Sequence, residues 1–371
     1  MSAEPIYLDW NATTPPHAEV LAAMARASRE TWANPASTHR LGRRARALVE
    51  DTREKLADLC AVHPRDVLFT SGGTEANNLA LSRARGVALS RLEHPSVTRV
   101  AEELAARGVP IEWVAVTPAG CAEPEAYRAA LRRLPSGSVV ALMAANHETG
   151  VLQPLEAVAL LAHEFGATLH VDAVQALGKL PPEAWRFADS LALAAHKIRG
   201  PKGIGALAFR GLNAPKPVLL GGSQERGLRP GTIDPVAAAG FLAALERAGN
   251  GPARYRELAC LRDDLEGALA SVALVNGGEA NRLPHVSNLS FMGNSGDEIV
   301  AALDLLGVCV SSGSACSAGT TEASPIITAM LGRERAKSAV RISLGETTTF
   351  GQIQAAKGAF LRTLGLSLPN P

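Results

Sequence analysis

The chain has 371 residues, of which 47% are hydrophobic and 20% are charged, and its formal net charge is +1 at pH 7. This length suffices for two domains with a large buried core, and the composition is that of an ordinary globular protein. A net charge so close to zero gives no electrostatic attraction to nucleic acid or to an acidic membrane, so we expect a small-molecule or protein partner.

Segments that would direct the chain to or through a membrane are not expected. No apolar run approaches the roughly 18 residues of a membrane span. Residues 1–5 lack the basic and then apolar start of a signal peptide. The sequence therefore predicts a cytoplasmic protein.

Apolar runs typical of buried strands recur along the chain, and stretches with helical spacing, such as 155–165, separate several of them. This alternation predicts an α/β domain with a mostly parallel sheet covered on both faces. Ligands of such sheets bind beyond the carboxyl ends of the strands. The predicted strands are 67–69, 87–89, 111–116, 139–144, 168–171, 191–194 and 204–209.

A change of composition at residues 249–252 (GNGP) marks the predicted start of a second domain. The charged, helix-like run 253–270 follows it directly. No linker rich in proline, glycine or serine divides the chain more cleanly.

A lysine and an aspartate stand at the ends of two neighbouring predicted strands. Lys197 follows the run 191–194 and precedes the glycine-rich turn 200–205, while Asp172 follows the run 168–171. A lysine that bonds an aldehyde and an aspartate that holds a ring nitrogen protonated are the two parts that a pyridoxal phosphate (PLP) enzyme needs. A solvated lysine and a helix-capping aspartate are the alternative interpretation of this pair.

The segment 71–75 (SGGTE) follows the predicted strand 67–69 and has the composition of a phosphate-binding turn. Glycines allow close approach of backbone N–H groups, and a helix that starts there directs its dipole at an anion. A simple turn between a strand and a helix would have the same composition.

The five cysteines are an odd number without a C-x-x-C pair, which fits neither a disulfide framework nor a zinc site. We expect reduced thiols and no metal. Cys316 lies among serine, alanine and glycine, where a thiol is accessible enough to act as a nucleophile. The other four are expected to be small buried hydrophobic residues: Cys60, Cys121, Cys260 and Cys309.

Nearly the whole chain resembles the cysteine desulfurases, in the class V aminotransferase branch of the PLP-dependent enzymes. Short motifs in the order typical of that family carry the resemblance. They are YLDWNATTP (7–15), NPASTH (34–39), FTSGGTEANN (69–78), EH (93–94), NHETG (146–150), HVDAVQ (170–175), HK (196–197), RGLRPGT (226–232), SSGSAC (311–316) and RISLG (341–345). The form SSGSAC matches the subgroup with a long active-site loop.

The resemblance implies the PLP-dependent transferase fold of type I, in which a large domain holds a mostly parallel seven-stranded sheet. That domain corresponds to residues 15–250. A smaller α/β domain corresponds to residues 1–14 and 251–371 and carries the loop of the catalytic cysteine. Members of this fold are homodimers with active sites at the subunit interface.

The resemblance also assigns roles to residues of the cofactor site. Lys197 holds PLP, Asp172 pairs with the ring nitrogen, and Gln175 donates to the ring hydroxyl. His94 stacks over the ring and moves protons. Asn146 and His147 contact the cofactor, and the phosphate binders are Gly73, Thr74, His196 and, across to the neighbouring subunit, Thr232.

Two positions depart from the family's pattern. Ala194 stands where the family usually has a phosphate-binding serine, so one hydrogen bond, worth roughly 1.5 to 3 kcal/mol when charge-assisted, is missing. His147 stands where the family typically has the second asparagine of an Asn-Asn pair. We expect these changes to affect cofactor affinity rather than the fold.

The reaction implied by the resemblance starts from L-cysteine. Lys197 removes the α-proton, and the Cys316 thiolate attacks the substrate sulfur, which leaves a persulfide on the enzyme and releases alanine. Arg341 holds the substrate carboxylate through a bidentate pair, and Asn34 also belongs to the substrate site. The persulfide sulfur then passes to an acceptor protein for iron–sulfur cluster assembly, for tRNA thiolation or for synthesis of a thio-cofactor.

Other functions of the same scaffold stay open at this point. A selenocysteine lyase, a cysteine sulfinate desulfinase or an aminotransferase would share the fold, since fold does not fix reaction. An aminotransferase would not need Cys316. A weakly catalytic sulfur-relay protein is the alternative from a different class, and Ala194 is the feature that favours it.

Overall fold

The computed structural model describes residues 4–211, 214–313 and 323–366. The strands in this part of the chain are β1 (Ile6–Tyr7), β2 (Val67–Thr70), β3 (Val87–Ser90), β4 (Ile111–Val114), β5 (Val139–Met143), β6 (Thr168–Asp172), β7 (Ser190–Ala194), β8 (Gly205–Phe209), β9 (Leu274–Val275), β10 (Val286–Ser290), β11 (Val308–Cys309) and β12 (Ala339–Ser343). The α-helices are α1 (Ala18–Glu30), α2 (Arg40–Cys60), α3 (Gly73–Leu81), α4 (Pro95–Ala106), α5 (Pro124–Leu131), α6 (Leu155–Glu164), α7 (Pro235–Ala248), α8 (Gly251–Glu257), α9 (Ala259–Leu269), α10 (Gly296–Leu305), α11 (Pro325–Leu331), α12 (Arg333–Lys337) and α13 (Phe350–Thr363).

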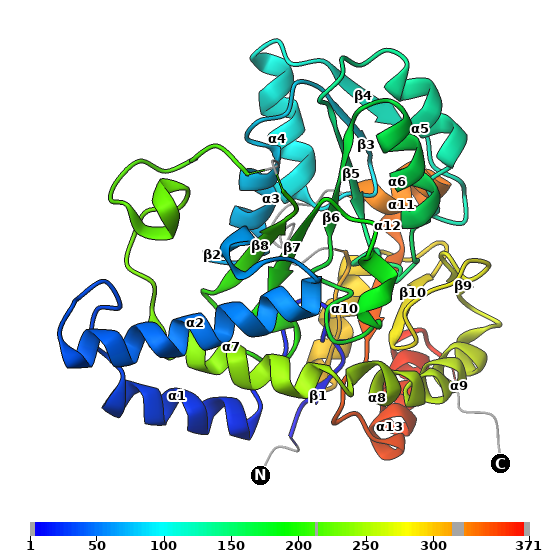
Figure 1. The fold of residues 1–371 in the computed structure, drawn as a ribbon. Helices are drawn as coiled ribbons and strands as arrows, with labels where there is room; N and C mark the ends of the chain where they lie inside the picture. The colour runs from blue at the N-terminus through cyan, green and yellow to red at the C-terminus, as the bar shows by residue number, and fades with distance from the viewer. Residues whose placement is uncertain (1–3, 212–213, 314–322, 367–371) are drawn as a thin grey trace.

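Seven strands form the large sheet, in the order β2-β8-β7-β6-β5-β3-β4 (Figure 1). All neighbouring pairs are parallel except those of β8, which runs antiparallel to both β2 and β7. The carboxyl ends of β2, β6 and β7 therefore meet at one edge of the sheet. The predicted α/β fold with a mostly parallel sheet is confirmed, and the antiparallel direction of β8 is a feature that the sequence pattern did not show.

Helices cover both faces of this sheet because its strands are apolar on both faces. In β2, Val67 and Phe69 point into the core that includes α2, α6 and α7, whereas Leu68 points to the opposite face and packs with α3. Strands β5 and β8 are buried along their whole length. The sheet thus holds its strand ends in fixed positions, and the loops at those ends carry the site.

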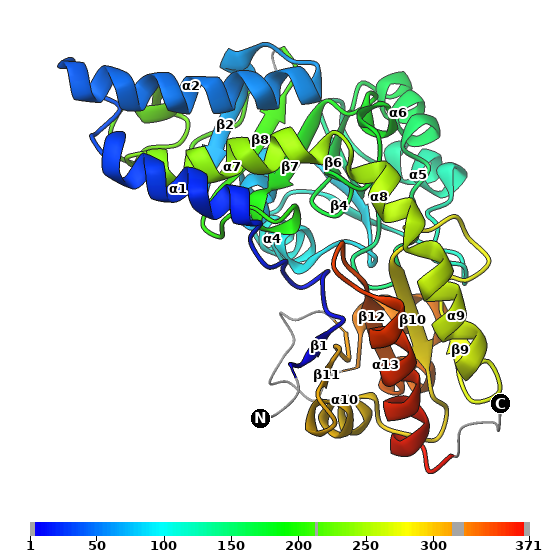
Figure 2. The same ribbon diagram turned by 90° about the horizontal axis from the view of Figure 1, so that it is seen from below.

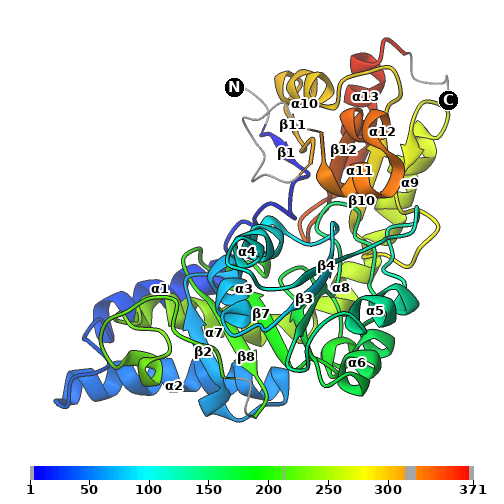
Figure 3. The same cartoon turned by 90° about the horizontal axis from the view of Figure 1, so that it is seen from above.

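A second core lies apart from the large sheet, around the antiparallel sheet β12-β10-β9 and helices α9, α10 and α13 (Figures 2 and 3). The start of the chain joins this region, because β1 pairs in parallel with β11 and Leu8 is buried in the second core. The run 253–270, predicted as one helix, is divided between α8 and α9 at Leu258.

Within the described ranges, no helix is long and apolar enough to cross a membrane.

Candidate active site

A cavity of about 190 Å³ opens at the carboxyl ends of β2, β6 and β7. It contains most of the residues predicted from the sequence, together with several that were not. Its lining residues are Asn11, Ala12, Gly73, Thr74, Asn77, His94, Ser96, Met143, Ala145, His147, Asp172, Val174, Gln175, Ala194, His196, Lys197 and Arg341. Asp172 and Lys197, which the sequence places after two predicted strands, both line this cavity.

Lys197 extends into the cavity from the short 3-10 turn that follows β7. Its Nζ donates hydrogen bonds to the backbone oxygen atoms of Asn11 and, at 2.8 Å, Ala12. The hydroxyl of Thr14 donates to the backbone oxygen of His196 at 2.8 Å, which ties the same N-terminal segment to this turn. The amine is thus held inside the cavity by two carbonyl groups from the start of the chain.

Asp172 ends β6 and is 8% exposed. Its Oδ1 accepts from the backbone N–H of Val174 at 3.0 Å, and its Oδ2 accepts from Asn77 Nδ2 at 2.8 Å. Two N–H donors thus hold this carboxylate in the cavity wall, where it could pair with a protonated ring nitrogen.

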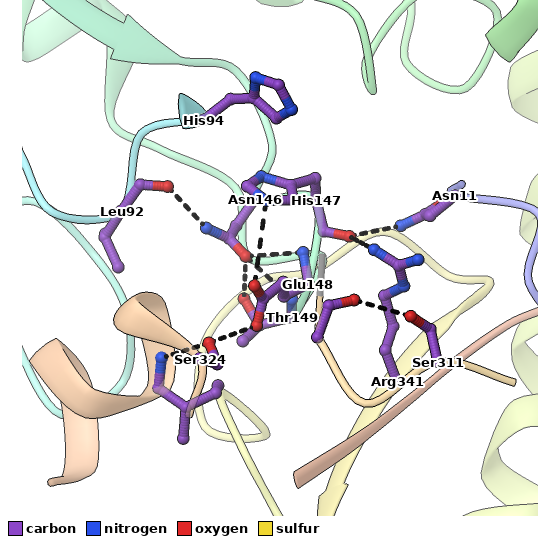
Figure 4. A network of polar contacts seen from close by, with 12 residues as sticks. Asn11, Leu92, His94, Asn146, His147, Glu148, Thr149, Ser311, Ser324 and Arg341 are labelled. Atoms are coloured by element: carbon purple, nitrogen blue, oxygen red, sulfur yellow. Dashed lines mark hydrogen bonds and ion pairs between the residues drawn. The ribbon is translucent and has the colours of Figure 1, made fainter. Parts of the chain in front are cut away.

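His94 is the N-cap of α4, and its Nδ1 accepts from the backbone N–H of Ser96 at 3.1 Å. Burial lowers the pKa of His94 and Lys197 lowers it further, while Asp172 raises it. The ring meets that of His147 edge to face, with centroids 5.2 Å apart (Figure 4). A flat ligand beside Asp172 would therefore have an aromatic ring next to it.

The start of α3 forms the end of the cavity that suits an anion. Gly73 is the first helical residue, and a Cβ there would come within 2.6 Å of Val174 Cγ2 and 3.9 Å of the Ala194 methyl group. The imidazole of His196 also lines the cavity, and its Nδ1 lies 3.1 Å from the hydroxyl of Thr13. Burial, with Lys197 next in size, lowers the pKa of His196 to about 4, so this ring is neutral at physiological pH.

Gln175 reaches the cavity from the loop after β6, and both ends of its amide are engaged. Its Nε2 donates to the backbone oxygen of Asn11, and its Oε1 accepts from Lys179 Nζ, each at 3.0 Å. Lys179 is a buried amine, and burial, with Lys197 as a second cause, lowers its pKa to about 7. Lys179 therefore fixes which end of the Gln175 amide is the donor, a role that no sequence pattern indicated.

Arg341, in β12, enters the cavity from the second core and is 1% exposed. Its Nη2 pairs with Asp9 at 2.7 Å. Its Nη1 donates to the backbone oxygen of His147 at 3.2 Å (Figure 4). Its Nε is buried without a hydrogen-bond partner among the described residues. The Asp9 carboxylate, which the sequence analysis did not assign, thus holds the guanidinium in place.

His147 is 7% exposed, and neither of its ring nitrogens has a hydrogen-bond partner in the described part of the chain. The nearest carboxylate oxygen, on Glu148, is 4.0 Å from Nε2. Burial, followed by His94, Arg341 and Lys197, holds the pKa of His147 well below its usual value. Buried polar atoms usually have hydrogen-bond partners. The two ring nitrogens of His147, a residue that lines the cavity, are therefore available to bond a ligand.

Asn146 does not reach the cavity. It is fully buried, its Nδ2 donates to the backbone oxygen of Leu92, and its Oδ1 accepts from the backbone N–H groups of Glu148 and Thr149 (Figure 4). These bonds fix the turn that presents His147. The predicted direct contact of Asn146 with the cofactor does not agree with this geometry, because its amide is already engaged by the backbone.

Asn34 and Thr232 lie together, but in a separate cavity of about 180 Å³ that also includes Arg53 and Glu225. The structure therefore does not bring them to Lys197 within one chain. Glu225 pairs with Arg53 at 2.7 Å and has a left-handed backbone with φ of 48°.

Cys316 lies outside the described residues, and the described residues on either side of its segment bond to a cavity residue, Arg341, and to Glu148, which follows the cavity residue His147. Ser311 exchanges backbone hydrogen bonds with Arg341, and the hydroxyl of Ser324 donates to Glu148 Oε2 at 2.6 Å. Of the other cysteines, Cys60 is buried, Cys121 and Cys309 are partly buried, and Cys260 is exposed. The prediction of a buried residue is therefore wrong for Cys260, which is on the surface of α9.

In the described part of the chain, no group of histidine, cysteine, aspartate and glutamate side chains could hold a metal ion. The residues present fit PLP instead. Lys197 can bond its aldehyde, Asp172 can pair with its ring nitrogen, and the start of α3 can bind its phosphate.

Comparisons with known proteins agree with this geometry. The model of the class-V aminotransferase family matches residues 6–356. A cysteine desulfurase of Cereibacter sphaeroides is 42% identical over 94% of this chain and 93% of its own length. The solved NifS-like protein of Rickettsia africae superposes with a TM-score of 0.89 at 30% identity, covering 98% of this chain and 100% of its own. A solved structure of SspA in complex with cysteine has a TM-score of 0.80 at 28% identity, over 92% of this chain and 99% of its own.

Proposed function

Because the chain belongs to the class-V aminotransferase family and is a PLP-dependent cysteine desulfurase, we propose that it stores the sulfur of L-cysteine as a persulfide on Cys316. The substrate C–S bond breaks, an S–S bond forms to Cys316, and the carbon skeleton leaves as L-alanine. The observation that carries the proposal is the meeting of Lys197, Asp172 and Arg341 in one cavity. Ser311, which precedes the Cys316 segment, is bonded to the backbone of Arg341.

Different residues of the cavity would bind the ring and the phosphate of the cofactor. PLP, when bound, supplies an electron sink for negative charge at the substrate Cα. Asp172, fixed by two N–H donors, would keep the ring nitrogen protonated, and His94 would stack beside the ring. The phosphate would lie at Gly73 and Thr74 with the neutral ring of His196 beside it.

Lys197 has two tasks that its surroundings allow. It would hold the cofactor covalently in the resting protein, and after the substrate displaces it, the free amine would take the α-proton. The backbone oxygen atoms of Asn11 and Ala12 give that displaced amine two acceptors inside the cavity. Borohydride reduction and peptide mapping should therefore find the pyridoxyl group on Lys197 rather than on Lys202.

Arg341 would bind the substrate carboxylate through its planar fork, with Asp9 compensating its charge before substrate arrives. The carboxylate would then face His147, whose ring nitrogens lack partners among the described residues. The Cys316 thiolate would then attack the sulfur of the bound substrate.

We also propose a homodimer in which Asn34 and Thr232 of each protomer serve the site of the other. Two observations support a position between subunits. Asn34 and Thr232 line a cavity of their own, and Leu220, on the loop between β8 and α7 that also carries Thr232, is 94% exposed. The two separate cores support the division into a cofactor domain, 15–250, and a domain formed by 1–14 and 251–371. The identity of the acceptor protein and the cytoplasmic location stay predictions.

The experiment that tests the function is a Cys316→Ser variant incubated with L-cysteine. Because a hydroxyl is a poor nucleophile toward sulfur, the variant should bind PLP, change its visible spectrum with L-cysteine, and yield neither persulfide nor alanine. Each of Cys60, Cys121, Cys260 and Cys309, replaced singly by alanine, should keep most activity. Turnover by Cys316→Ser near the wild-type rate would refute the persulfide mechanism.

A further inference from the structure

Beside the cofactor cavity, five polar side chains form a continuous chain of hydrogen bonds, whose three middle members are buried and whose two ends are half-buried. Ser190 Oγ lies 2.9 Å from His170 Nδ1, and His170 Nε2 lies 2.9 Å from Asn77 Oδ1. Asn77 Nδ2 donates to Ser96 Oγ at 2.8 Å, and Ser96 Oγ lies 2.8 Å from His94 Nδ1. This chain connects strands β6 and β7 to the ring that stands over the cofactor position.

The direction of each hydrogen bond follows from Asp172. An ionised carboxylate only accepts, so the Asn77 group 2.8 Å from Asp172 Oδ2 must be the NH₂ group. The amide oxygen of Asn77 then faces His170, and His170 must carry its proton on Nε2. Its Nδ1 is left to accept from Ser190. Burial lowers the pKa of His170 to about 4, which agrees with this neutral form.

The same reasoning fixes the proton of His94. Ser96 Oγ accepts from Asn77, so its own hydrogen is available for His94 Nδ1, which also accepts from the backbone N–H of Ser96 at 3.1 Å. A nitrogen that receives two donors does not carry a proton itself. The proton of the neutral ring is therefore on Nε2.

The charges around His94 agree with a neutral ring. Asp172 favours its protonation, whereas burial and Lys197 disfavour it more strongly. His147, edge to face with His94, is itself held neutral.

We propose that Asn77, oriented by His170 and Asp172, is a positioning residue that fixes His94 as the neutral Nε2–H tautomer. His94 then presents an N–H donor rather than a lone pair to the cavity, and the α-proton goes to Lys197. The Asn77 amide thus links Asp172, the proposed partner of the ring nitrogen, to the tautomer of His94, the residue proposed to stack on the ring. This inference rests on the proposed place of His94 beside the cofactor.

The direct test is the tautomer of His94 in the PLP-loaded protein labelled with ¹⁵N-histidine. Among the signals of the nine histidines, those of His94 can be identified as the pair that is lost in a His94→Gln sample. At neutral pH, we expect Nδ1 to have the shift of an unprotonated nitrogen and Nε2 that of a protonated one. A protonated Nδ1 in the wild-type protein would overturn the proposal whether or not any variant folds.

The coupling is tested by Asn77→Asp against Asn78→Asp, which makes the same substitution one residue away. A carboxyl group at 77 would lie against Asp172, so the two carboxyls would share one proton. The oxygen at 77 would then accept from Ser96, so Ser96 Oγ could accept from His94 and Nδ1 should become protonated. Asn78 instead donates to backbone oxygen atoms, of Thr74 at 2.8 Å and of Ser96 at 3.4 Å, and not to the Ser96 hydroxyl, so Asn78→Asp should leave the tautomer of His94 unchanged.

Two further outcomes separate this proposal from the proposed function. If Asn77→Asp folds and His94 keeps its wild-type tautomer, Asn77 does not position it. If wild-type protein converts no L-cysteine but shows the expected tautomer, the proposed reaction fails while the positioning role of Asn77 stands.

Discussion

The two sides of the cavity differ in how their polar groups are matched. On the cofactor side, which we define as Asn77, Asp172 and Lys197, the polar groups make protein hydrogen bonds. The other side consists of Arg341 and the neighbouring His147, and we call it the substrate side after the proposed role of Arg341. Both ring nitrogens of His147 and Nε of Arg341 are buried there without partners in the described residues.

This difference reflects what each side must do. Groups that hold a resident cofactor work best when their geometry is fixed in advance, because no reorganisation is then required during the reaction. Groups that recognise a substrate keep unmatched polar atoms, and burying such an atom costs about 1–3 kcal/mol until a ligand matches it. A polar ligand that bonds these atoms would therefore bind more tightly than an apolar ligand of the same shape.

The largest effect is expected from a substitution of Arg341 on the substrate side. Arg341→Lys keeps the charge beside Asp9 but removes the planar fork, so KM for L-cysteine should rise about 100-fold, or ~2.7 kcal/mol. Steady-state kinetics check this, and the visible spectrum of the bound cofactor should not change. A fall in kcat at constant KM would contradict the assignment of Arg341 to the substrate carboxylate.

The second largest effect is expected from a substitution of Asp172 on the cofactor side. Asp172→Asn removes the anion that would pair with the ring nitrogen, so PLP should dissociate about 30-fold faster, within the ~1.5–3 kcal/mol of a charge-assisted bond. Stopped-flow transfer of PLP to an apo-acceptor enzyme measures the rate. Asp189→Asn, at a carboxylate that binds the backbone N–H of Leu169 outside the cavity, is the control and should keep the wild-type rate.

A smaller effect sharpens the comparison by adding a donor to the cofactor side. Ala194 faces the phosphate end of the cavity near Gly73, so Ala194→Ser should slow PLP dissociation by up to about tenfold, ~1.4 kcal/mol. Ala192→Ser, two residues earlier on β7 and fully buried away from the cavity, should give no such gain. An unchanged rate in Ala194→Ser would mean that other groups already match the phosphate.

The smallest effect concerns the unmatched ring of the substrate side. His147→Asn restores the pair of asparagines typical of the family and replaces one neutral polar group by another, so kcat/KM should change less than about fivefold, ~1 kcal/mol. Because the pKa of His147 is held well below its usual value, its removal should leave the pH profile between 6 and 9 unchanged. Loss of an inflection near neutral pH would show that His147 titrates during catalysis.

Most of the large sheet could be predicted from the sequence. Strands buried on both faces read as continuous apolar runs, and the predicted run 191–194 differs from β7 by one residue. The antiparallel direction of β8 could not be predicted, because a buried strand is apolar in either direction. The break at Leu258 was missed because α8 and α9 share one helical pattern.

The sequence by itself predicted that Lys197, Asp172 and Gly73 lie close together, and all three line one cavity. Local signals mark strand ends and glycine turns, and parallel strands bring their carboxyl ends to the same edge of a sheet. Only the tertiary structure decided the partners of these residues. Asp9 meets Arg341 across 332 positions, and His170 meets Asn77 across 93. No local periodicity encodes such contacts, since they depend on how two cores and the start of the chain pack. The same packing engages the Asn146 side chain in hydrogen bonds with the backbone. It also places Asn34 and Thr232 in a cavity separate from that of Lys197 in the same chain.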